Sequence, residues 1–171
     1  MNIDKGRTYV SWQNRSFEFY IAARLLFQKG LYVAAAFTAS QTIELLLKAT
    51  LVYWDDTFNP KKFNHDIKLL VSEAQKKVPG AYDIKIPSYF SFENRFYMVT
   101  RYPIKGKGVG IEITFVSDLD KIFADLICSV PFQHNTALKN ALSGRLNNNN
   151  KLNALRRGNA EIRRIRKFLS A

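Results

Sequence analysis

The residues best placed to do chemistry stand in an otherwise apolar stretch of the chain. Gln41, Glu44 and Lys48 are spaced three and four residues apart, so they would share one face of a helix. Spacing alone favours an ordinary surface ion pair between Glu44 and Lys48, worth about 0.3–0.5 kcal/mol. The alternative is a polar stripe that faces a ligand-binding cleft.

A second group of candidates precedes a proline. Arg101 comes two residues before Pro103, where a cation at the last turn of a helix complements the helix dipole. Arg101 could instead bind an anion beside Tyr97, which would share its helix face, and that pairing suits a nucleotide. Lys105 and Lys107 follow at once and could bind phosphate. The surrounding glycines, at 106, 108 and 110, do not form a recognised phosphate-binding pattern, so we predict a flexible loop there.

Few other side chains offer chemistry. The only histidines are His65 and His134, and the only cysteine, Cys128, lies in an apolar run. We expect Cys128 to be a buried, inert thiol. No cluster of His, Cys and Asp has the spacing of metal ligands, so we predict no metal and no cofactor.

The elements that would position these residues are mainly helical. Apolar residues recur at helical spacing, and Gly30 ends the first helix closely enough to make the first two antiparallel neighbours. We predict helices over residues 12–28, capped by Ser11; 31–54; 65–77, capped by Asn64; 88–100; 117–130, opened by a capping box from Ser117 to Asp120; and 137–146. A short strand or extended loop is expected over 104–115. The pattern predicts an all-α fold, an antiparallel up-and-down bundle of about five helices with residues 31–54 as its central helix.

Charge divides the chain into two parts. The formal net charge is +12, and residues 131–171 hold nine Lys and Arg against one acid. We therefore predict a helical bundle over residues 1–130 and a basic, amphipathic helical extension over 131–171. The extension is either a solubilising tail or a surface for a polyanion such as nucleic acid. The N-terminus does not resemble a signal peptide and no stretch is long and apolar enough to span a membrane, so we expect a cytoplasmic protein.

Three segments resemble the HEPN domain family. Residues 25–49 look like its opening helix pair, His65 followed by Ile67 and Leu70 resembles its His-led third helix, and Tyr97–Pro103 resembles its Tyr-x-x-Thr-Arg-Tyr-Pro segment. The resemblance covers roughly residues 11–130. It implies an antiparallel helical bundle, often dimeric. Many members are metal-independent RNases of toxin and defence systems, and others are nucleotide-binding or accessory modules paired with minimal nucleotidyltransferases.

The same resemblance argues against a competent nuclease. The nuclease motif of the family is an Arg followed, after four to six residues, by His. With Arg101 as that Arg, the His should stand at 106, 107 or 108, and the residues there are Gly, Lys and Gly. The proton-transfer group of the reaction is therefore missing from its motif position. His134 would be a distant substitute, and we expect His65 to cap or pack the third helix.

These observations predict a homodimeric HEPN-like module that binds a nucleotide or RNA without cleaving it and has no catalytic residue. The predicted ligand-binding residues are Gln41, Glu44, Lys48, Tyr97, Arg101, Lys105 and Lys107. Three alternatives stay open: an atypical RNase that uses Arg101 with His134 or a group from a partner, an accessory subunit of a nucleotidyltransferase, and an interaction subunit that docks an acidic protein.

Overall fold

A computed structural model describes residues 3–81, 83–87, 90, 114–129, 136–143 and 149–170. Within these residues there is no β-strand, and the prediction of an all-α fold is confirmed. The helices are α1 (Ile3–Gln28), α2 (Tyr32–Trp54), α3 (Ile67–Lys77), α5 (Phe115–Cys128), α6 (Thr136–Ser143), α7 (Asn149–Arg156) and α8 (Ile162–Ser170), with a 3₁₀ turn, η1 (Pro60–Phe63).

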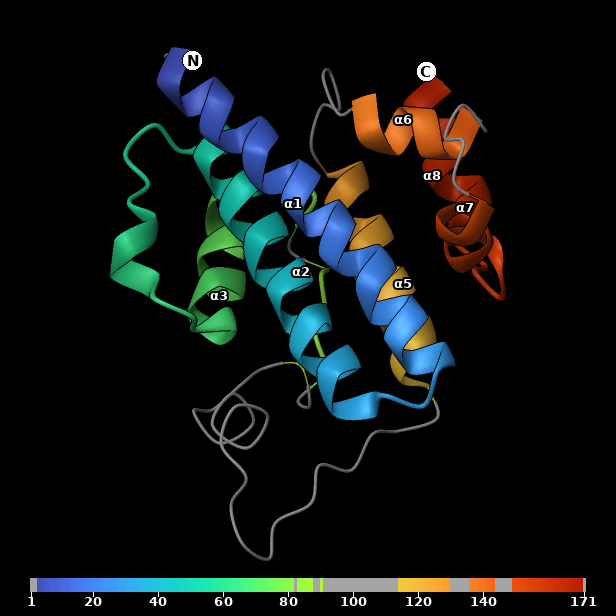
Figure 1. Cartoon of the computed structure of the whole chain (residues 1–171). Helices are drawn as coiled ribbons and strands as arrows, with labels where there is room; N and C mark the ends of the chain where they lie inside the picture. The colour runs from blue at the N-terminus through green and yellow to red at the C-terminus, as the bar shows by residue number, and fades with distance from the viewer. Residues whose placement is uncertain are drawn as a thin grey trace, which may run out of the picture.

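The first two helices lie side by side and run antiparallel (Figure 1). Gly30, with a φ of 73°, ends α1. The Leu31 N–H donates to the Leu26 carbonyl at 2.9 Å and the Gly30 N–H donates to the Phe27 carbonyl at 3.0 Å. This pair of bonds is the Schellman motif, which favours glycine because its middle residue is left-handed.

Helix α2 is the centre of the bundle, as the sequence predicts. It packs against α1, α3 and α5, and Ala35, Ala39, Ile43 and Leu47 are fully buried along it. The alanines allow the backbone of a neighbouring helix to approach closely, whereas the larger residues fill the core.

Three predicted helix starts are wrong, and packing between helices explains two of them. Helix α1 begins at Ile3 and not after Ser11, because Tyr9 is buried against Tyr53 of α2, with ring centroids 5.3 Å apart. Helix α5 begins at Phe115, which is buried beside Phe27, so residues 117–120 lie inside the helix and form no capping box.

The cap of the third helix is also one turn-forming residue later than expected. Asp66, not Asn64, caps α3, and its carboxylate accepts the Leu69 N–H at 3.0 Å. An Asp side chain is an equally good N-cap, so the sequence alone does not separate the two positions.

The basic C-terminal segment is helical and packs on the bundle (Figure 1). Helices α6 and α7 contact α1, and α8 contacts α5. The continuous helix expected after residue 150 is instead two helices, α7 and α8, separated by a turn at Gly158 with a φ of 65°. Leu138, Leu155 and Ile165 from these helices are buried in the same core as α1 and α5.

The helix predicted over residues 88–100 and the strand or loop predicted over 104–115 fall almost wholly outside the described residues. Phe90 is the exception in the first segment. It lies in a turn, is buried, and packs against Phe115 with ring centroids 5.1 Å apart.

Candidate functional site

A buried carboxylate organises the polar cluster on α2. Glu44 is 4 % exposed and Lys48 is 9 % exposed, so the expectation of a surface ion pair is wrong. The Lys48 Nζ donates to Glu44 Oε1 at 2.7 Å. A charge pair taken out of water loses solvation, which only close geometry and further hydrogen bonds recover.

The turn between η1 and α3 supplies two of those further contacts. The Lys48 Nζ also donates to the Asn64 carbonyl at 2.6 Å. Asn64 has a φ of 45°, a conformation that Asn adopts more readily than most residues. This turn presents the carbonyl of Asn64 to Lys48 and places the next residue, His65, beside Glu44.

His65 connects the buried carboxylate to the surface. Its Nδ1 lies 3.0 Å and 3.1 Å from the two carboxylate oxygens of Glu44, whereas its side chain is 57 % exposed. An N–H at Nδ1 would donate to Glu44 and fix the orientation of the ring. His65 therefore pairs with α2 and does not cap α3, contrary to the sequence prediction.

The remaining α2 candidate lies at the edge of this cluster. Gln41 is half-buried and its Nε2 donates to Glu44 Oε2 at 3.4 Å. The structure thus brings Gln41, Glu44 and Lys48 together as one polar group within the most apolar helix of the bundle. The other predicted site residues, Tyr97, Arg101, Lys105 and Lys107, and the candidate His134 lie outside the described residues.

A second polar cluster, which the sequence analysis missed, is closed to solvent. Arg24 on α1 is 1 % exposed and forms a salt bridge with both carboxylate oxygens of Asp120 on α5. The Tyr20 hydroxyl donates to the same carboxylate at 2.6 Å. Burial raises the pKa of the Asp120 carboxyl above its usual range, an effect that the positive charge of Arg24 partly offsets.

The C-terminal helices complete this second cluster. The Arg24 Nε donates to the Ala154 carbonyl at 2.6 Å, and a terminal nitrogen of Arg24 donates to the Arg157 carbonyl. Arg24 thereby satisfies carbonyls at the C-terminal end of α7, where the helix leaves them unpaired. The Asn159 amide donates to the Tyr20 hydroxyl at 2.8 Å.

No local sequence signal marks this second cluster. Arg24 and Asp120 are separated by 96 residues, and neither lies in a pattern that chemistry would single out. A weak signal was present in the apolar surroundings of Arg24, between Ala23 and Leu25, because a charged residue inside an apolar helix face needs a buried partner.

Two searches of the described residues give negative findings. No described helix has the length and apolarity that crossing a membrane requires. Among the same residues, no three His, Cys, Asp or Glu side chains gather closely enough to hold a metal ion.

Comparison with known proteins gives one match. The model of the HEPN domain family matches residues 9–121, a range that contains the Glu44 cluster and ends just after Asp120. No curated protein and no solved structure matches the chain. Helices α6, α7 and α8 lie beyond the matched range.

Proposed function

The chain belongs to the HEPN domain family, and from this premise we propose that it is a cytoplasmic nucleotide- or RNA-binding module without RNase activity. Gln41, Glu44 and Lys48 form the floor of the binding site, and His65 lies at its rim. Tyr97, Arg101, Lys105 and Lys107 contribute a stacking ring and phosphate-binding cations.

The observation that carries this proposal is the open, buried polar cluster on α2. A buried ion pair contributes little net stability compared with apolar residues of the same size. Its presence in an otherwise apolar helix, with an exposed imidazole attached to it, is therefore better explained by ligand binding than by folding. Lys48 and His65 offer donors to a phosphate, and Glu44 offers an acceptor to a sugar hydroxyl or a base.

The absence of RNase activity rests on the sequence. Gly106, Lys107 and Gly108 occupy the positions at which the family motif has its histidine. A lysine of ordinary pKa, near 10.4, is a poor base at neutral pH. Loss of a general acid–base group typically lowers a rate by about 10²–10⁴-fold, whereas the cations that bind phosphate would remain.

Binding is tested with a fluorescent nucleoside triphosphate and a labelled single-stranded RNA. We expect Lys48→Met to weaken nucleotide binding by about 10-fold or more, and the exposed Lys76→Met on α3 to change it less than 2-fold. Because Lys48 is buried, Gln41→Ala and Arg101→Ala provide further variants, and circular dichroism checks each fold. Equal affinity in wild type and in all three site variants would refute the proposed site.

Cleavage is tested by incubating the protein with labelled single-stranded RNA in the absence of metal. We expect RNA binding that weakens with salt and little or no cleavage. Robust cleavage that Arg101→Ala abolishes would show that the protein is an RNase after all.

One observation favours the atypical RNase as a second candidate. The exposed imidazole of His65 is oriented by a carboxylate, as in many general acid–base pairs. If cleavage occurs, its loss in His65→Asn would assign the proton transfer to this pair, and its loss in His134→Ala would assign it to His134.

We also propose a homodimer and a nucleotidyltransferase partner, both on the family resemblance. Analytical ultracentrifugation at micromolar concentration tests the dimer, and a species of only 19.7 kDa would refute it. Co-purification with the product of a neighbouring nucleotidyltransferase gene tests the partner.

A further inference from the structure

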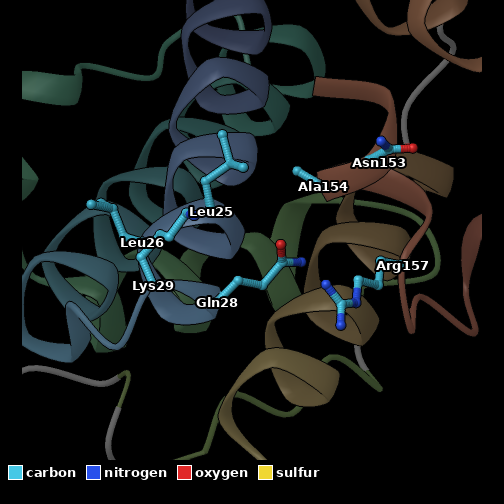
Figure 2. A pocket seen from close by; sticks show the side chains of 7 residues that line it. All are labelled: Leu25, Leu26, Gln28, Lys29, Asn153, Ala154 and Arg157. Carbon is cyan, nitrogen blue, oxygen red and sulfur yellow. The ribbon is translucent and has the colours of Figure 1, made fainter. Parts of the chain in front are cut away.

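A groove lies between the C-terminal end of α1 and α7, outside the Glu44 cluster. Its volume is about 460 Å³, within the range of pockets that hold small ligands. It is lined by two sets of residues, Leu25, Leu26, Gln28 and Lys29 from α1, and Asn153, Ala154 and Arg157 from α7 and the turn after it (Figure 2).

The lining combines the three chemistries that a nucleotide needs. Leu25, Leu26 and Ala154 give an apolar surface on which a base can lie. Gln28 and Asn153 are exposed amides, each with a donor and an acceptor for a base edge. Lys29 and Arg157 are exposed cations, and no acid lines the groove. The side chains of Gln28 and Arg157 extend toward each other across it (Figure 2).

Arg24 holds the two walls of the groove in place from inside. It belongs to α1 and donates to the carbonyls of Ala154 and Arg157, which belong to the opposite wall. Its salt bridge with Asp120 anchors it to α5 as well. A groove with fixed walls binds without the entropy cost of ordering them.

The surface beyond the groove is basic. Lys151, Arg156, Arg163 and Lys167 of α7 and α8 are exposed. The one acid in residues 149–170 is Glu161, and it contacts Arg164 at 3.4 Å. A negatively charged chain that enters the groove would therefore meet further cations along α7 and α8.

We propose that this groove binds one nucleotide of a single-stranded RNA, with the neighbouring phosphates on Lys29, Arg157 and the exposed cations of α7 and α8. Single-stranded RNA fits better than duplex, because the base must be unstacked to reach the apolar floor and the amides. An acidic peptide would use the cations but would leave the two amides without their purpose. This site is separate from the Glu44 cluster, and its test does not depend on nucleotide binding there.

The charge test reverses the two cations of the groove. We expect Lys29→Glu with Arg157→Glu to weaken binding of a labelled 12-nucleotide single-stranded RNA by at least about 10-fold. The slope of log affinity against log salt should fall by about 2, one for each lost phosphate contact. The matched control is Arg7→Glu with Lys76→Glu, which makes the same charge change on exposed residues elsewhere. Arg7 lies about 33 Å from Lys29 along α1, at about 1.5 Å per residue.

A second test fills the groove without changing charge. Asn153→Trp places a large ring at an exposed position of the groove, and Ser72→Trp makes the same kind of change at an exposed position of α3. We expect Asn153→Trp to weaken RNA binding at least about 5-fold and Ser72→Trp to have no effect. Thermal unfolding of each variant shows that the fold is kept.

Three results would overturn the inference. Wild type may fail to bind the RNA, both charge variants may weaken it equally, or polyglutamate may compete as well as RNA of equal charge, which would assign the surface to an acidic protein. Binding of the fluorescent nucleoside triphosphate separates the two sites. Groove variants should leave it unchanged, whereas Lys48→Met should reduce it, so either proposal can fail while the other stands.

Discussion

Two buried charge pairs in this chain differ in what surrounds them. Arg24 and Asp120 have side chains that are 1 % and 2 % exposed, and their partners, Tyr20 and Asn159, are also buried. Glu44 and Lys48 are buried too, but they connect to the exposed His65. A cluster closed on all sides can only hold the protein together, whereas a cluster with an open side can exchange partners with a ligand. The first pair is therefore structural, and the second is the candidate site.

Removing one member of the closed pair should be costly. Arg24→Met would leave the Asp120 carboxylate buried without a counter-charge and would free the carbonyls of Ala154 and Arg157. We expect the free energy of unfolding to fall by about 3–5 kcal/mol, measured by urea denaturation. The double variant Arg24→Met with Asp120→Leu should recover part of this loss, because no lone charge remains buried. A loss below about 1 kcal/mol in Arg24→Met would contradict the structural role.

Tyr20 should make the fold sensitive to alkaline pH. Burial, reinforced by the charge of Asp120, raises the pKa of the Tyr20 phenol well above its usual range. In the unfolded chain the phenol ionises near pH 10. The stabilisation from keeping it protonated is therefore complete below about pH 10 and is lost as pH rises toward the folded-state pKa, at up to about 1.4 kcal/mol per pH unit.

Urea denaturation of wild type and Tyr20→Phe between pH 9 and 11 tests this slope. Tyr20→Phe should be less stable at pH 7 by about 1–2 kcal/mol, since the hydrogen bonds to Asp120 and Asn159 are lost. Its stability should nevertheless fall less steeply above pH 10. Burial also raises the pKa of Tyr9, so Tyr9→Phe should show the same reduction in slope. Identical slopes in wild type and Tyr20→Phe would refute the assignment.

Residue-scale prediction from sequence succeeded where a local period carried the information. The three- and four-residue spacing brought Gln41, Glu44 and Lys48 together correctly, but it does not report burial, so the pair was placed on the surface. The contact between Glu44 and His65 spans 21 residues and a turn, and the contact between Arg24 and Asp120 spans the bundle. Contacts of that kind depend on how helices pack, which a single sequence does not encode locally.

At the scale of elements, the same distinction separates the helix interiors from their ends. The interiors of α1, α2 and α3 follow from apolar periodicity, and the end of α1 follows from Gly30. The starts of α1 and α5 do not, because aromatic contacts with neighbouring helices extend both beyond the local capping residues. The turn between α7 and α8 was foreshadowed by Gly158, which was expected only to weaken a single helix.

Gly158 makes that turn possible. Its φ of 65° is left-handed, and a Cβ at this position would meet no atom within 4 Å. The cost of Gly158→Ala should therefore be the backbone cost alone, about 1–2 kcal/mol of stability in urea denaturation. Gly158→Asn should cost less, because Asn adopts this conformation more readily. A stabilised Gly158→Ala variant would show that α7 and α8 form one helix.

At the scale of the whole molecule, the matched family region and the C-terminal helices share one core. The HEPN model ends at residue 121, whereas buried residues from α6, α7 and α8 join the same apolar cluster as α1 and α5. The division of the chain near residue 130 stays a prediction. The charge pattern that suggested it describes the outer surface of the last helices and does not report the inner surface, where Leu155 and Ile165 are buried.

The closed polar cluster predicts what removal of the C-terminal helices would do. A chain that ends at residue 130 would lose the Ala154 and Arg157 carbonyls and the Asn159 amide. Tyr20, Arg24 and the apolar side of α1 would be exposed to water. Burial of each large apolar side chain contributes about 1.5–3 kcal/mol, so the loss of Leu138, Leu155 and Ile165 alone approaches the 5–15 kcal/mol of a typical domain. We expect the truncated chain to lack a cooperative thermal transition, as measured by circular dichroism and calorimetry.

A matched control separates loss of packing from loss of charge. The full-length chain with Arg163, Arg164 and Lys167 changed to Gln keeps the buried residues of α8 but removes three of its exposed cations. It should unfold cooperatively, with a stability close to wild type because exposed ion pairs such as Arg164–Asp125 contribute at most about 1 kcal/mol. Its RNA affinity should nevertheless fall. If the chain truncated at residue 130 unfolds as cooperatively as wild type, the C-terminal helices are a separable appendage and Arg24 does not need them.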